Sequence, residues 1–382
     1  MKIAYFMDNV SNHGGVERII IDKANYLAVL PGYEVSIVCM GRRNDAGPAY
    51  PVDPRVRLHF LDCEFNPTVG INRPVTFTFQ WIKWWRKLAK AVKRFYRDYR
   101  PDLAVSLAYD CNRPYRNRRI PHIYESHAYR PMAESLSIVP GMTHFLISNF
   151  VTKGANVVAL TGADALEWPE AARVEVIPNF TNIRPVASYN PSSKKVIAAG
   201  RLDDQKGFNL LIKAWHMVAK RFPEHTLEIF GADGSGLMLP RLQMLIAERG
   251  LTGLVHLRGI TDNMPAAFAE GEAFVLSSRF EGFPLVLIEA MACGIPPVAF
   301  DCPHGPADLV DNGINGILVP FKNLSDEERI ELLTDGLCRM LSLSDEERKQ
   351  MSEAAMMKAA SFSREAIMER WVKLFKEIAV CE

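Results

Sequence analysis

Between residues 277 and 292 the chain reads SSRFEGFPLVLIEAMA. The segment follows an apolar, β-branched run at 273–277 and continues into a run of helix-forming residues. Gly282 provides a turn, and Pro284 stands near the first helical position, where a missing N–H group is tolerated. The pattern therefore predicts a buried strand, a tight turn and a helix, as in the repeating unit of a parallel sheet.

Similar apolar runs recur along the chain between amphipathic segments. The predicted strands are 2–7, 35–39, 103–107, 156–160, 174–177, 195–199, 227–230, 255–257, 273–277, 297–300 and 316–319. Continuous rather than alternating apolar runs favour parallel sheets that helices cover on both faces. The strand–helix alternation starts again near Lys195, after an irregular stretch at 178–193 that contains three prolines. We therefore predict an α/β protein with two Rossmann-like, doubly wound domains joined by a linker.

The predicted N-terminal domain covers residues 1–185, and the predicted C-terminal domain covers residues 190–382. The tail at 364–380 has apolar residues at helical spacing, so we expect an amphipathic C-terminal helix docked on the body of the protein. Two Ser-Asp-Glu-Glu-Arg segments, at 325–329 and 344–348, each fit the capping box that opens a helix.

Composition excludes several classes of protein. The chain has 382 residues, of which 48% are hydrophobic and 23% charged, so a collagenous, coiled-coil or disordered chain is excluded. The net charge is +1, but residues 1–190 carry 24 Lys or Arg against 17 Asp or Glu, and the remainder carries 21 against 27. A basic half joined to an acidic half suggests two modules with different partners.

The seven cysteines, at 39, 63, 111, 293, 302, 338 and 381, form no CxxC pair. Such a scattered set predicts buried free thiols in a reducing compartment and no zinc site. The first residues stay apolar only as far as Met7, which is too short for a signal peptide. No run reaches the roughly 18 apolar residues of a membrane span. We therefore expect a cytoplasmic protein.

Two carboxylates flank the predicted turn and helix start at 281–285. The free N–H groups of a helix start form an anion site suited to a diphosphate. Beside such a site, Glu281 and Glu289 should accept hydrogen bonds from sugar or ribose hydroxyls. The alternative is a solvated Glu281 and an ordinary helical Glu289.

Upstream, the segment GRLDDQKG at 200–207 follows another predicted strand. Arg201 can contact a phosphate through two N–H groups, and Lys206 supplies a point charge. Two cations on a turn after a strand suit a nucleotide diphosphate, and a solvated basic turn is the alternative.

These segments resemble glycosyltransferase family 4, also described as glycosyl transferases group 1. Glu281 and Glu289 reproduce the E-x7-E signature of retaining GT-B glycosyltransferases, and residues 200–207 match the family motif G-R-x4-K-G. The resemblance continues through ACGIPPVA at 292–299, GP at 305–306 and NGING at 312–316. It covers the second half of the chain and, more faintly, the first. It implies a GT-B fold whose two domains face a cleft, with the donor nucleotide on the second domain and the acceptor mainly on the first.

The resemblance also implies roles for individual residues. Arg201 and Lys206 would hold the donor diphosphate, together with amides at the helix start. Pro284 has no N–H group, so Phe283 and Leu285 are the better amide donors. The base would be held at 255–261, mainly through the backbone. The implied donor-binding set is Gly15, Arg201, Lys206, Ile260, Thr261, Glu281, Gly282, Phe283, Leu285 and Glu289, and the implied catalytic residues are Glu281 and His127.

The first half contributes fewer candidates. Gly14 and Gly15 follow the first predicted strand, and the resemblance implies that they face the donor phosphates or the acceptor. His127 could hydrogen-bond a sugar hydroxyl or steady the charge that develops at the anomeric carbon, with a structural histidine as the alternative. His13 and His304 are weaker candidates. In the second half, FGADGSG at 230–236 resembles the family's glycine-rich loop but is not a dinucleotide fingerprint.

The segment 81–100 is strongly basic, with eight Lys or Arg residues against Asp98 alone, a net charge of +7. Its apolar residues Trp81, Trp85, Leu88, Val92, Phe95 and Tyr99 follow a helical stripe, with Trp84 beside it. Such a helix can lie on an anionic membrane at the inner face of the plasma membrane, or pack its stripe on its own sheet, and both can hold at once. No recognised nucleic-acid-binding motif accompanies the charge, so no nucleic-acid partner is expected.

The resemblance predicts a retaining, metal-independent hexosyltransferase that needs no cofactor. It would move a hexose or an N-acetylhexosamine from a nucleotide sugar, UDP preferred, to a glycan or lipid-linked acceptor in cell-surface polysaccharide synthesis. One alternative is a nucleotide-sugar binding or scaffold protein without catalysis, and a second is a GT-B epimerase. The missing dinucleotide fingerprint disfavours a nicotinamide-dependent dehydrogenase.

Overall fold

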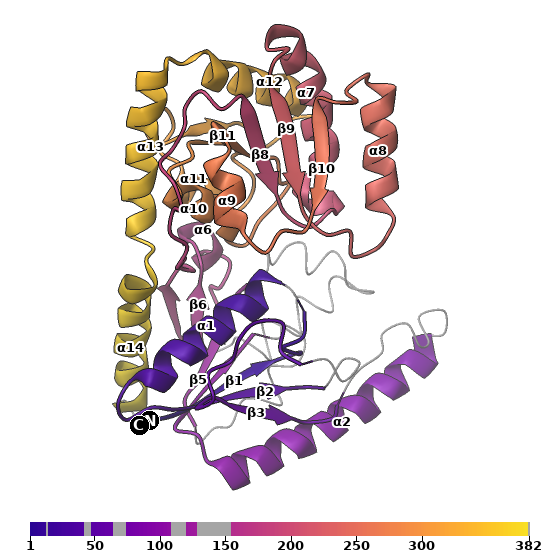
Figure 1. Ribbon diagram of the computed structural model, residues 1–382. Coiled ribbons are helices and arrows are strands. Elements are labelled where there is room, and N and C mark those ends of the chain that lie inside the picture. The colour runs from indigo at the N-terminus through magenta and orange to yellow at the C-terminus, as the bar shows by residue number, and fades with distance from the viewer. Residues whose placement is uncertain (13, 42–46, 64–73, 108–119, 128–153, 381–382) are drawn as a thin grey trace. The chain divides into compact units, whose positions relative to one another are not determined.

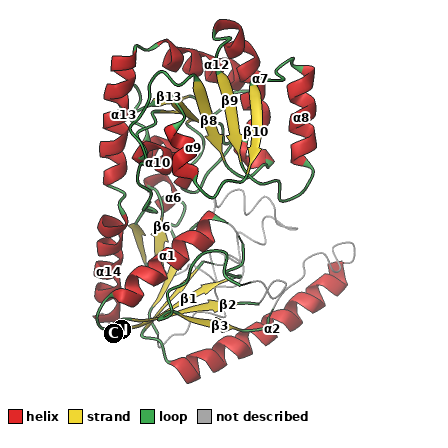
Figure 2. Cartoon of the chain, viewed as in Figure 1, coloured by secondary structure: helices red, strands yellow, loops and turns green. Residues whose placement is uncertain are grey.

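The computed structural model describes residues 1–12, 14–41, 47–63, 74–107, 120–127 and 154–380 (Figure 1). Contacts divide the chain into two compact units, one formed by Met1–Ile177 with Ile367–Glu382 and the other by Pro178–Ala366. Each unit contains one parallel sheet accompanied by helices (Figure 2). The predicted α/β class with two doubly wound halves is therefore confirmed.

The N-terminal unit is built on a seven-stranded parallel sheet with the order β3-β2-β1-β4-β5-β6-β7. Its strands are β1 Lys2–Met7, β2 Glu34–Cys39, β3 Arg57–Phe60, β4 Leu103–Ser106, β5 His122–Glu125, β6 Asn156–Ala159 and β7 Arg173–Val176. Its described helices are α1 Gly15–Val29, α2 Pro74–Tyr99, α6 Gly162–Ala165 and α14 Arg364–Val380. The sequence predicts all of these strands except β3 and β5.

Helix α2 carries the basic segment and packs its apolar stripe on its own sheet. Leu88, Val92 and Phe95 are buried in one cluster with Phe6 of β1 and Val38 of β2. The cations of this helix that lie on the other side are exposed: Lys83, Arg86, Lys87, Lys90, Lys93, Arg94 and Arg97, with Arg100 just beyond the helix end. The core-packing interpretation of the stripe is therefore confirmed, and the charged face stays open to solvent.

Helix α14 buries its apolar face, as its helical spacing predicts, but it groups with the N-terminal unit. Trp371 and Phe375 are fully buried, and Arg173 of β7 forms an ion pair with Glu377 at 2.7 Å. The predicted boundaries assign this tail to the C-terminal domain, so the observed division differs from them for residues 367–382. Periodicity identifies the buried face of a helix, but it carries no information about which sheet that face covers.

The C-terminal unit is built on a six-stranded parallel sheet with the order β10-β9-β8-β11-β12-β13. Its strands are β8 Lys195–Ala199, β9 Thr226–Phe230, β10 Val255–Gly259, β11 Ala273–Leu276, β12 Pro297–Phe300 and β13 Ile317–Val319. Its helices are the 3-10 turn η2 Asp204–Lys206, α7 Phe208–Arg221, α8 Met238–Glu248, α9 Met264–Ala269, α10 Leu285–Ala292, α11 Pro306–Leu309, α12 Asp326–Ser342 and α13 Asp345–Ala360. All six strands are predicted by the sequence, within three residues at each end.

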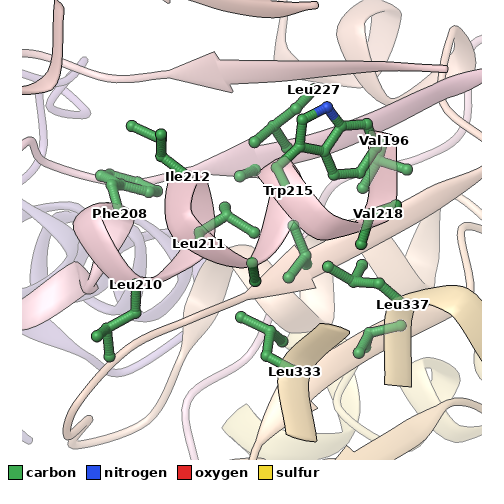
Figure 3. Close-up of a cluster of buried hydrophobic side chains, with 14 of the residues drawn as sticks. Val196, Phe208, Leu210, Leu211, Ile212, Trp215, Val218, Leu227, Leu333 and Leu337 are labelled. Atoms are coloured by element: carbon green, nitrogen blue, oxygen red, sulfur yellow. The ribbon is translucent and has the colours of Figure 1, made fainter. Parts of the chain in front are cut away.

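The core of this unit lies between its sheet and the pair α7 and α12 (Figure 3). Trp215 of α7 is fully buried, and Leu333 of α12 belongs to the same cluster. Both predicted capping boxes are present, at Ser325 for α12 and at Ser344 for α13. They satisfy the first N–H groups of these two helices and so fix where each begins.

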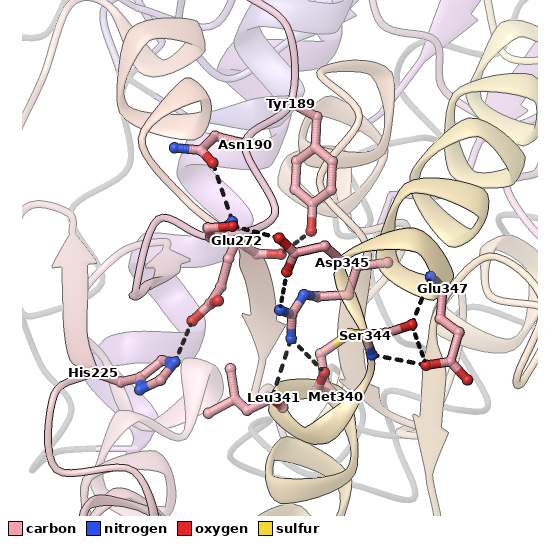
Figure 4. A network of polar contacts seen from close by, with 11 residues as sticks. Tyr189, Asn190, His225, Glu272, Met340, Leu341, Ser344, Asp345 and Glu347 are labelled. Atoms are coloured by element: carbon pink, nitrogen blue, oxygen red, sulfur yellow. Dashed lines mark hydrogen bonds and ion pairs between the residues drawn. The ribbon is translucent and has the colours of Figure 1, made fainter.

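The predicted linker at 178–193 is anchored on the C-terminal unit (Figure 4). The Tyr189 hydroxyl donates a hydrogen bond to the carbonyl of Glu272 at 2.6 Å, and the Ser192 hydroxyl donates to Asp345 at the same distance. The buried Arg348 donates to the other carboxylate oxygen of Asp345 and to the carbonyl of Leu341. These bonds explain why the division between units falls at the start of the linker, before Pro178.

The described cysteines match the prediction of buried free thiols. Cys39, Cys63, Cys293, Cys302 and Cys338 are all buried and free. Cys111 and Cys381 lie outside the described residues. Within the described part of the chain, no helix combines the length and hydropathy needed to cross a membrane.

Candidate functional site

The strand order of the C-terminal sheet has a switch point between β8 and β11. Strands β9 and β10 extend the sheet on one side of β8, whereas β11, β12 and β13 extend it on the other. At such a switch point the loops beyond the carboxyl ends of the two strands diverge, which is where open α/β sheets bind ligands. The loop 200–207 follows β8 and the loop 277–284 follows β11, so both predicted donor-binding segments meet at this point.

These two loops are tied together by hydrogen bonds. The Arg279 N–H group donates to the carbonyl of Gln205 at 2.7 Å, and the Gln205 side chain donates to the carbonyl of Phe280 at 3.1 Å. The Ser277 hydroxyl donates to the carbonyl of Lys206 at 2.8 Å. Each loop therefore fixes the backbone of the other.

Gly207 permits this close approach. Its φ of +62° lies in the left-handed region, and a Cβ atom there would stand 2.1 Å from the carbonyl oxygen of Ser277. Only glycine meets both conditions without a shift of the backbone. One residue earlier, the Lys206 N–H group donates to the Asp203 carboxylate at 3.1 Å, which closes the short turn η2.

The side chains of Lys206 and Glu281 meet between these loops. The Lys206 ammonium lies 2.7 Å from Oε1 of Glu281, and the two side chains are 14% and 6% exposed. The Glu281 N–H group donates to the carbonyl of Pro303, so the loop after β12 also supports the site. The pair places a cation and a carboxylate at one position that solvent still reaches.

Helix α10 begins at Leu285, shortly after Glu281 and Gly282. Pro284 is its N-cap residue, and the Leu287 N–H group already bonds to the Pro284 carbonyl. Phe283 is buried and packs its ring 5.8 Å from that of Phe362. Leu285 is the first helical residue, and Glu289 is buried within the same helix. The predicted strand, turn and helix are therefore present, and Glu281 of the Lys206–Glu281 pair lies in the turn before the helix.

The other C-terminal candidates are more open. The Arg201 side chain is 66% exposed and lies 3.3 Å from the Asp203 carboxylate. Ile260 is exposed on the loop after β10, and the Thr261 hydroxyl accepts a hydrogen bond from Asn263 at 3.1 Å. All three follow the carboxyl ends of β8 or β10, on the edge of the sheet where Lys206 also lies.

The glycine-rich segment at 230–236 joins this edge through the backbone. A Cβ atom at Gly231 would stand 1.8 Å from the carbonyl oxygen of Gly200, and the Gly231 N–H group donates to the carbonyl of Gly259. The segment thus keeps the ends of β8, β9 and β10 close together.

The N-terminal candidates lie in the other unit. Gly15 is the first residue of α1 and Gly14 is its N-cap, as the sequence predicts for a strand–helix turn. His127 follows β5, and its Nε2 lies 2.8 Å from Oε1 of Glu125. His13 lies outside the described residues. In the C-terminal unit, His304 is buried in the loop after β12 with φ of +62°.

Sequence reasoning missed several residues that shape these places. Gln205, Ser277 and Pro303 act through hydrogen bonds with the backbone, which leave little pattern in a sequence. Lys23 and Glu125 form a fully buried ion pair in the N-terminal unit. A signal for Lys23 exists, because it occupies a position of the apolar face of α1, where a cation is out of place.

Comparison with known proteins adds the family. Residues 179–357 match the model of the family described as "Glycosyl transferases group 1", which spans nearly the whole C-terminal unit. The matched region is just under half of the chain, so the similarity to this family lies in the C-terminal unit. An uncharacterized glycosyltransferase from Haemophilus influenzae is 28% identical over 374 residues, covering 97% of this chain and 98% of the relative. The amylovoran biosynthesis glycosyltransferase AmsD from Erwinia amylovora is 24% identical with the same coverage.

Other curated relatives of this chain are matched only in part, over 21% to 49% of their own length. Solved structures confirm the fold. Sucrose-phosphate synthase from Thermosynechococcus elongatus superposes with a TM-score of 0.81 at 18% identity, with full coverage of both chains. Anabaena HepE in complex with UDP superposes with a TM-score of 0.70 at 18% identity, covering 99% of this chain and 100% of that one. The predicted GT-B fold class is confirmed.

Proposed function

We propose that this protein is a group 1 glycosyl transferase that moves a hexose or an N-acetylhexosamine from a UDP-sugar to a glycan or lipid-linked acceptor. In this proposal the anomeric configuration is retained, no metal ion takes part, and the product belongs to cell-surface polysaccharide synthesis. The carrying observation is the Lys206–Glu281 pair, held 2.7 Å apart at the switch point of the C-terminal sheet. A cation for a diphosphate and a carboxylate for a sugar hydroxyl are both needed by a nucleotide-sugar donor, and here they stand together.

The donor diphosphate binds Lys206 and Arg201, and its remaining charge faces the N–H groups of Phe283 and Leu285 at the start of α10. Glu281 accepts a hydrogen bond from a donor sugar hydroxyl while it keeps Lys206 in place. The base lies against Ile260 and Thr261, and Glu289 accepts a hydrogen bond from a sugar or ribose hydroxyl. Gly15 is also proposed to bind the donor.

The transfer step breaks the bond between the anomeric carbon and the diphosphate oxygen. The acceptor hydroxyl forms the new bond on the face that the nucleotide leaves, and its proton passes to the departing diphosphate. Lys206 and Arg201 stabilise the negative charge that develops on that group. His127 contacts the reacting sugar in the proposed arrangement.

The relatives support the class of donor and product. HepE from Anabaena has been solved with UDP, and AmsD from Erwinia amylovora is named for amylovoran biosynthesis. We carry UDP and polysaccharide synthesis over to this chain as part of the proposal.

A panel of nucleotide sugars, with membrane extract or defined glycans as acceptors, tests the proposal. We expect Lys206→Ala and Glu281→Ala each to lower kcat/KM about 100-fold or more, as the loss of a transition-state contact does. Lys220→Ala is the matched control, because Lys220 is exposed at the end of α7. Transfer should persist in EDTA, and NMR of the product should show the anomeric configuration of the donor.

Three outcomes contradict the proposal in different ways. Unchanged transfer in Lys206→Ala and Glu281→Ala would show that these two residues do not form the donor site. Calorimetric binding of a sugar nucleotide without transfer to any acceptor would favour a binding or scaffold protein. Isomerisation of the sugar nucleotide without an acceptor would favour an epimerase.

We also propose that the protein associates with anionic membrane at the inner face of the plasma membrane through α2. The apolar stripe of this helix is buried in the N-terminal unit, so the contact would be electrostatic, made by its exposed cations, rather than an insertion of the helix. A lipid-linked acceptor would then be presented where the enzyme is already bound.

Sedimentation with vesicles of an anionic lipid tests this location. Lys83, Lys90, Lys93 and Arg94 are changed together to Gln, leaving Lys87, which donates to the carbonyl of Asp62. We expect binding to fall at least tenfold, because each cation near such a surface contributes about 1 kcal/mol. The control changes Lys220, Arg241, Lys322 and Lys349, which are exposed in the C-terminal unit and alter the net charge equally. Equal binding of both variants would contradict the location.

A further inference from the structure

A closed ion pair lies inside the N-terminal unit. Lys23 of α1 and Glu125 of β5 pair with both side chains fully buried. The Lys23 ammonium lies 4.1 Å from the centroid of the ring of Trp371, a residue of α14. Removing two charges from water costs more than such a pair usually returns, so a buried pair is weak evidence for stability alone. We therefore expect the two charges to have a role besides stabilising the fold.

His127 is the group that this pair supports. Glu125 and His127 are two residues apart at the end of β5. The imidazole Nε2 lies 2.8 Å from Oε1 of Glu125, the same oxygen that pairs with Lys23, and the His127 side chain is only 7% exposed. One carboxylate oxygen thus stands between a lysine ammonium and a ring that can gain a proton.

We propose that Glu125 and Lys23 are positioning residues for His127, in which Glu125 orients the imidazole and Lys23 cancels the carboxylate charge, so that His127 meets the sugar as a neutral ring. This inference rests on the proposed function, because it assigns the reacting sugar as the partner of His127.

The charges around the ring explain the arrangement. Burial alone would raise the pKa of Glu125, but the Lys23 charge and the hydrogen bonds from His127 and Lys23 outweigh it and hold that pKa below its usual value. Burial lowers the pKa of Lys23, and the Glu125 charge opposes this. Tyr5 of β1 also faces Glu125, and burial followed by the Glu125 charge raises its pKa well above the usual value, so it stays neutral. Trp371 brings no charge from α14.

A proton on His127 would therefore leave a net positive charge in a closed space, which burial disfavours. The neutral ring instead donates from Nε2 to Glu125 and keeps Nδ1 as an acceptor for a sugar hydroxyl. A neutral ring also avoids repelling the positive charge that develops at the anomeric carbon during transfer. Lys23 is essential to this balance, since Glu125 alone would favour the charged imidazolium.

The titration of His127 tests the balance without any need for activity. The full-length protein is labelled at the ring carbons of its 9 histidines, and His127→Gln assigns the resonance. We expect Lys23→Met to raise the midpoint of His127, and Glu125→Gln to lower it, each by about 1 pH unit or more. The double variant Lys23→Met/Glu125→Gln should titrate above Glu125→Gln, because the unbalanced cation is gone. His216, in the C-terminal unit, is the internal reference and should not move.

Opposite shifts separate this role from a purely structural one, which would lower stability without moving the midpoint in two directions. If Lys23→Met fails to fold, the comparison of Glu125→Gln with the double variant decides the matter. Equal midpoints of His127 in the native protein and in the folded variants would overturn the inference. Shifted midpoints in a protein that transfers no sugar would instead overturn the proposed function and leave the charge balance standing. In an active protein, the acidic limb of kcat/KM should follow the same shifts.

Discussion

Two of the lysine–glutamate pairs in the described part of the chain have the same chemistry and opposite accessibility. Lys23 and Glu125 are both 0% exposed, whereas Lys206 and Glu281 are 14% and 6% exposed. The first pair is closed by a tryptophan ring from α14, and the second lies between loops at the switch point of its sheet. Solvent, and therefore a ligand, reaches only the second.

The difference shows how burial divides work between similar groups. A closed pair can act only on its immediate neighbours, and Lys23–Glu125 has one functional neighbour, His127. An open pair can exchange a partner for a ligand, and in the proposed function Lys206 turns from Glu281 to a phosphate. In the two proposals, the same two residue types thus serve positioning in one unit and binding in the other.

The largest expected effect comes from breaking the closed pair. Lys23→Met should lower the free energy of unfolding by about 3–5 kcal/mol, because it leaves Glu125 as an uncompensated buried charge. Lys206→Met should cost clearly less, because water can approach Glu281. Urea unfolding measures both, and hydrogen exchange of peptides from α1 and β5 shows which unit is affected.

The double variant Lys23→Met/Glu125→Gln is the control for this prediction. It removes both charges at similar volume and should recover most of the lost stability. A loss below about 1 kcal/mol in Lys23→Met would show that the pair behaves as a surface pair and would remove the contrast between the two sites.

The next effect concerns how the open pair is held. Gly207→Ala places a Cβ atom 2.1 Å from the Ser277 carbonyl oxygen at a φ of +62°. We expect a loss of about 2 kcal/mol or more and a weaker affinity for UDP, since the shift displaces the neighbouring Lys206. Gly250→Ala is the matched control: its φ is +66° and nothing lies within 4 Å of the added atom. Equal losses in the two variants would mean that the loops do not constrain Lys206.

Much of the fold follows from the sequence because its strands are continuous apolar runs. The exceptions are β3, with the sequence RLHF, and β5, with HIYE. In both, charged or polar residues interrupt the apolar run, and only pairing with neighbouring strands makes them part of the sheet. The assignment of α14 to the N-terminal unit has the same cause, since the choice of sheet is a long-range property.

The candidate sites divide in the same way. The loops around Lys206 and Glu281 are local sequence motifs. Each turn in them needs particular residues at fixed spacing, so the sequence predicts them. The support of His127 joins three elements, through Lys23, Glu125 and Trp371, that are far apart in the chain. No local spacing encodes such a contact, although a lysine on the apolar face of α1 hints at it.

The smallest expected effect belongs to a third and more open pair. Arg279, in the loop after β11, donates two hydrogen bonds of 2.9 Å to Asp326, and the side chains are 27% and 37% exposed. Arg279, together with Arg329 at 2.9 Å, lowers the pKa of Asp326 to about 2, so the interaction contributes fully above the ordinary value of 3.8 and is lost as the pH falls toward about 2. We expect Asp326→Asn to cost less than about 1 kcal/mol at pH 7, because solvent screens the pair.

Urea unfolding of the native protein and of Asp326→Asn, from pH 7 downward, measures this contribution. The difference between the two proteins should shrink as the pH falls from about 4 to about 2, and it should also shrink in high salt. Asp335→Asn, on an exposed position of the same helix α12, should show neither trend. A cost as large as that of Lys23→Met, or one that salt leaves unchanged, would show that exposure does not order the three pairs. Solvent exposure would then not explain which of the three pairs is open to a ligand.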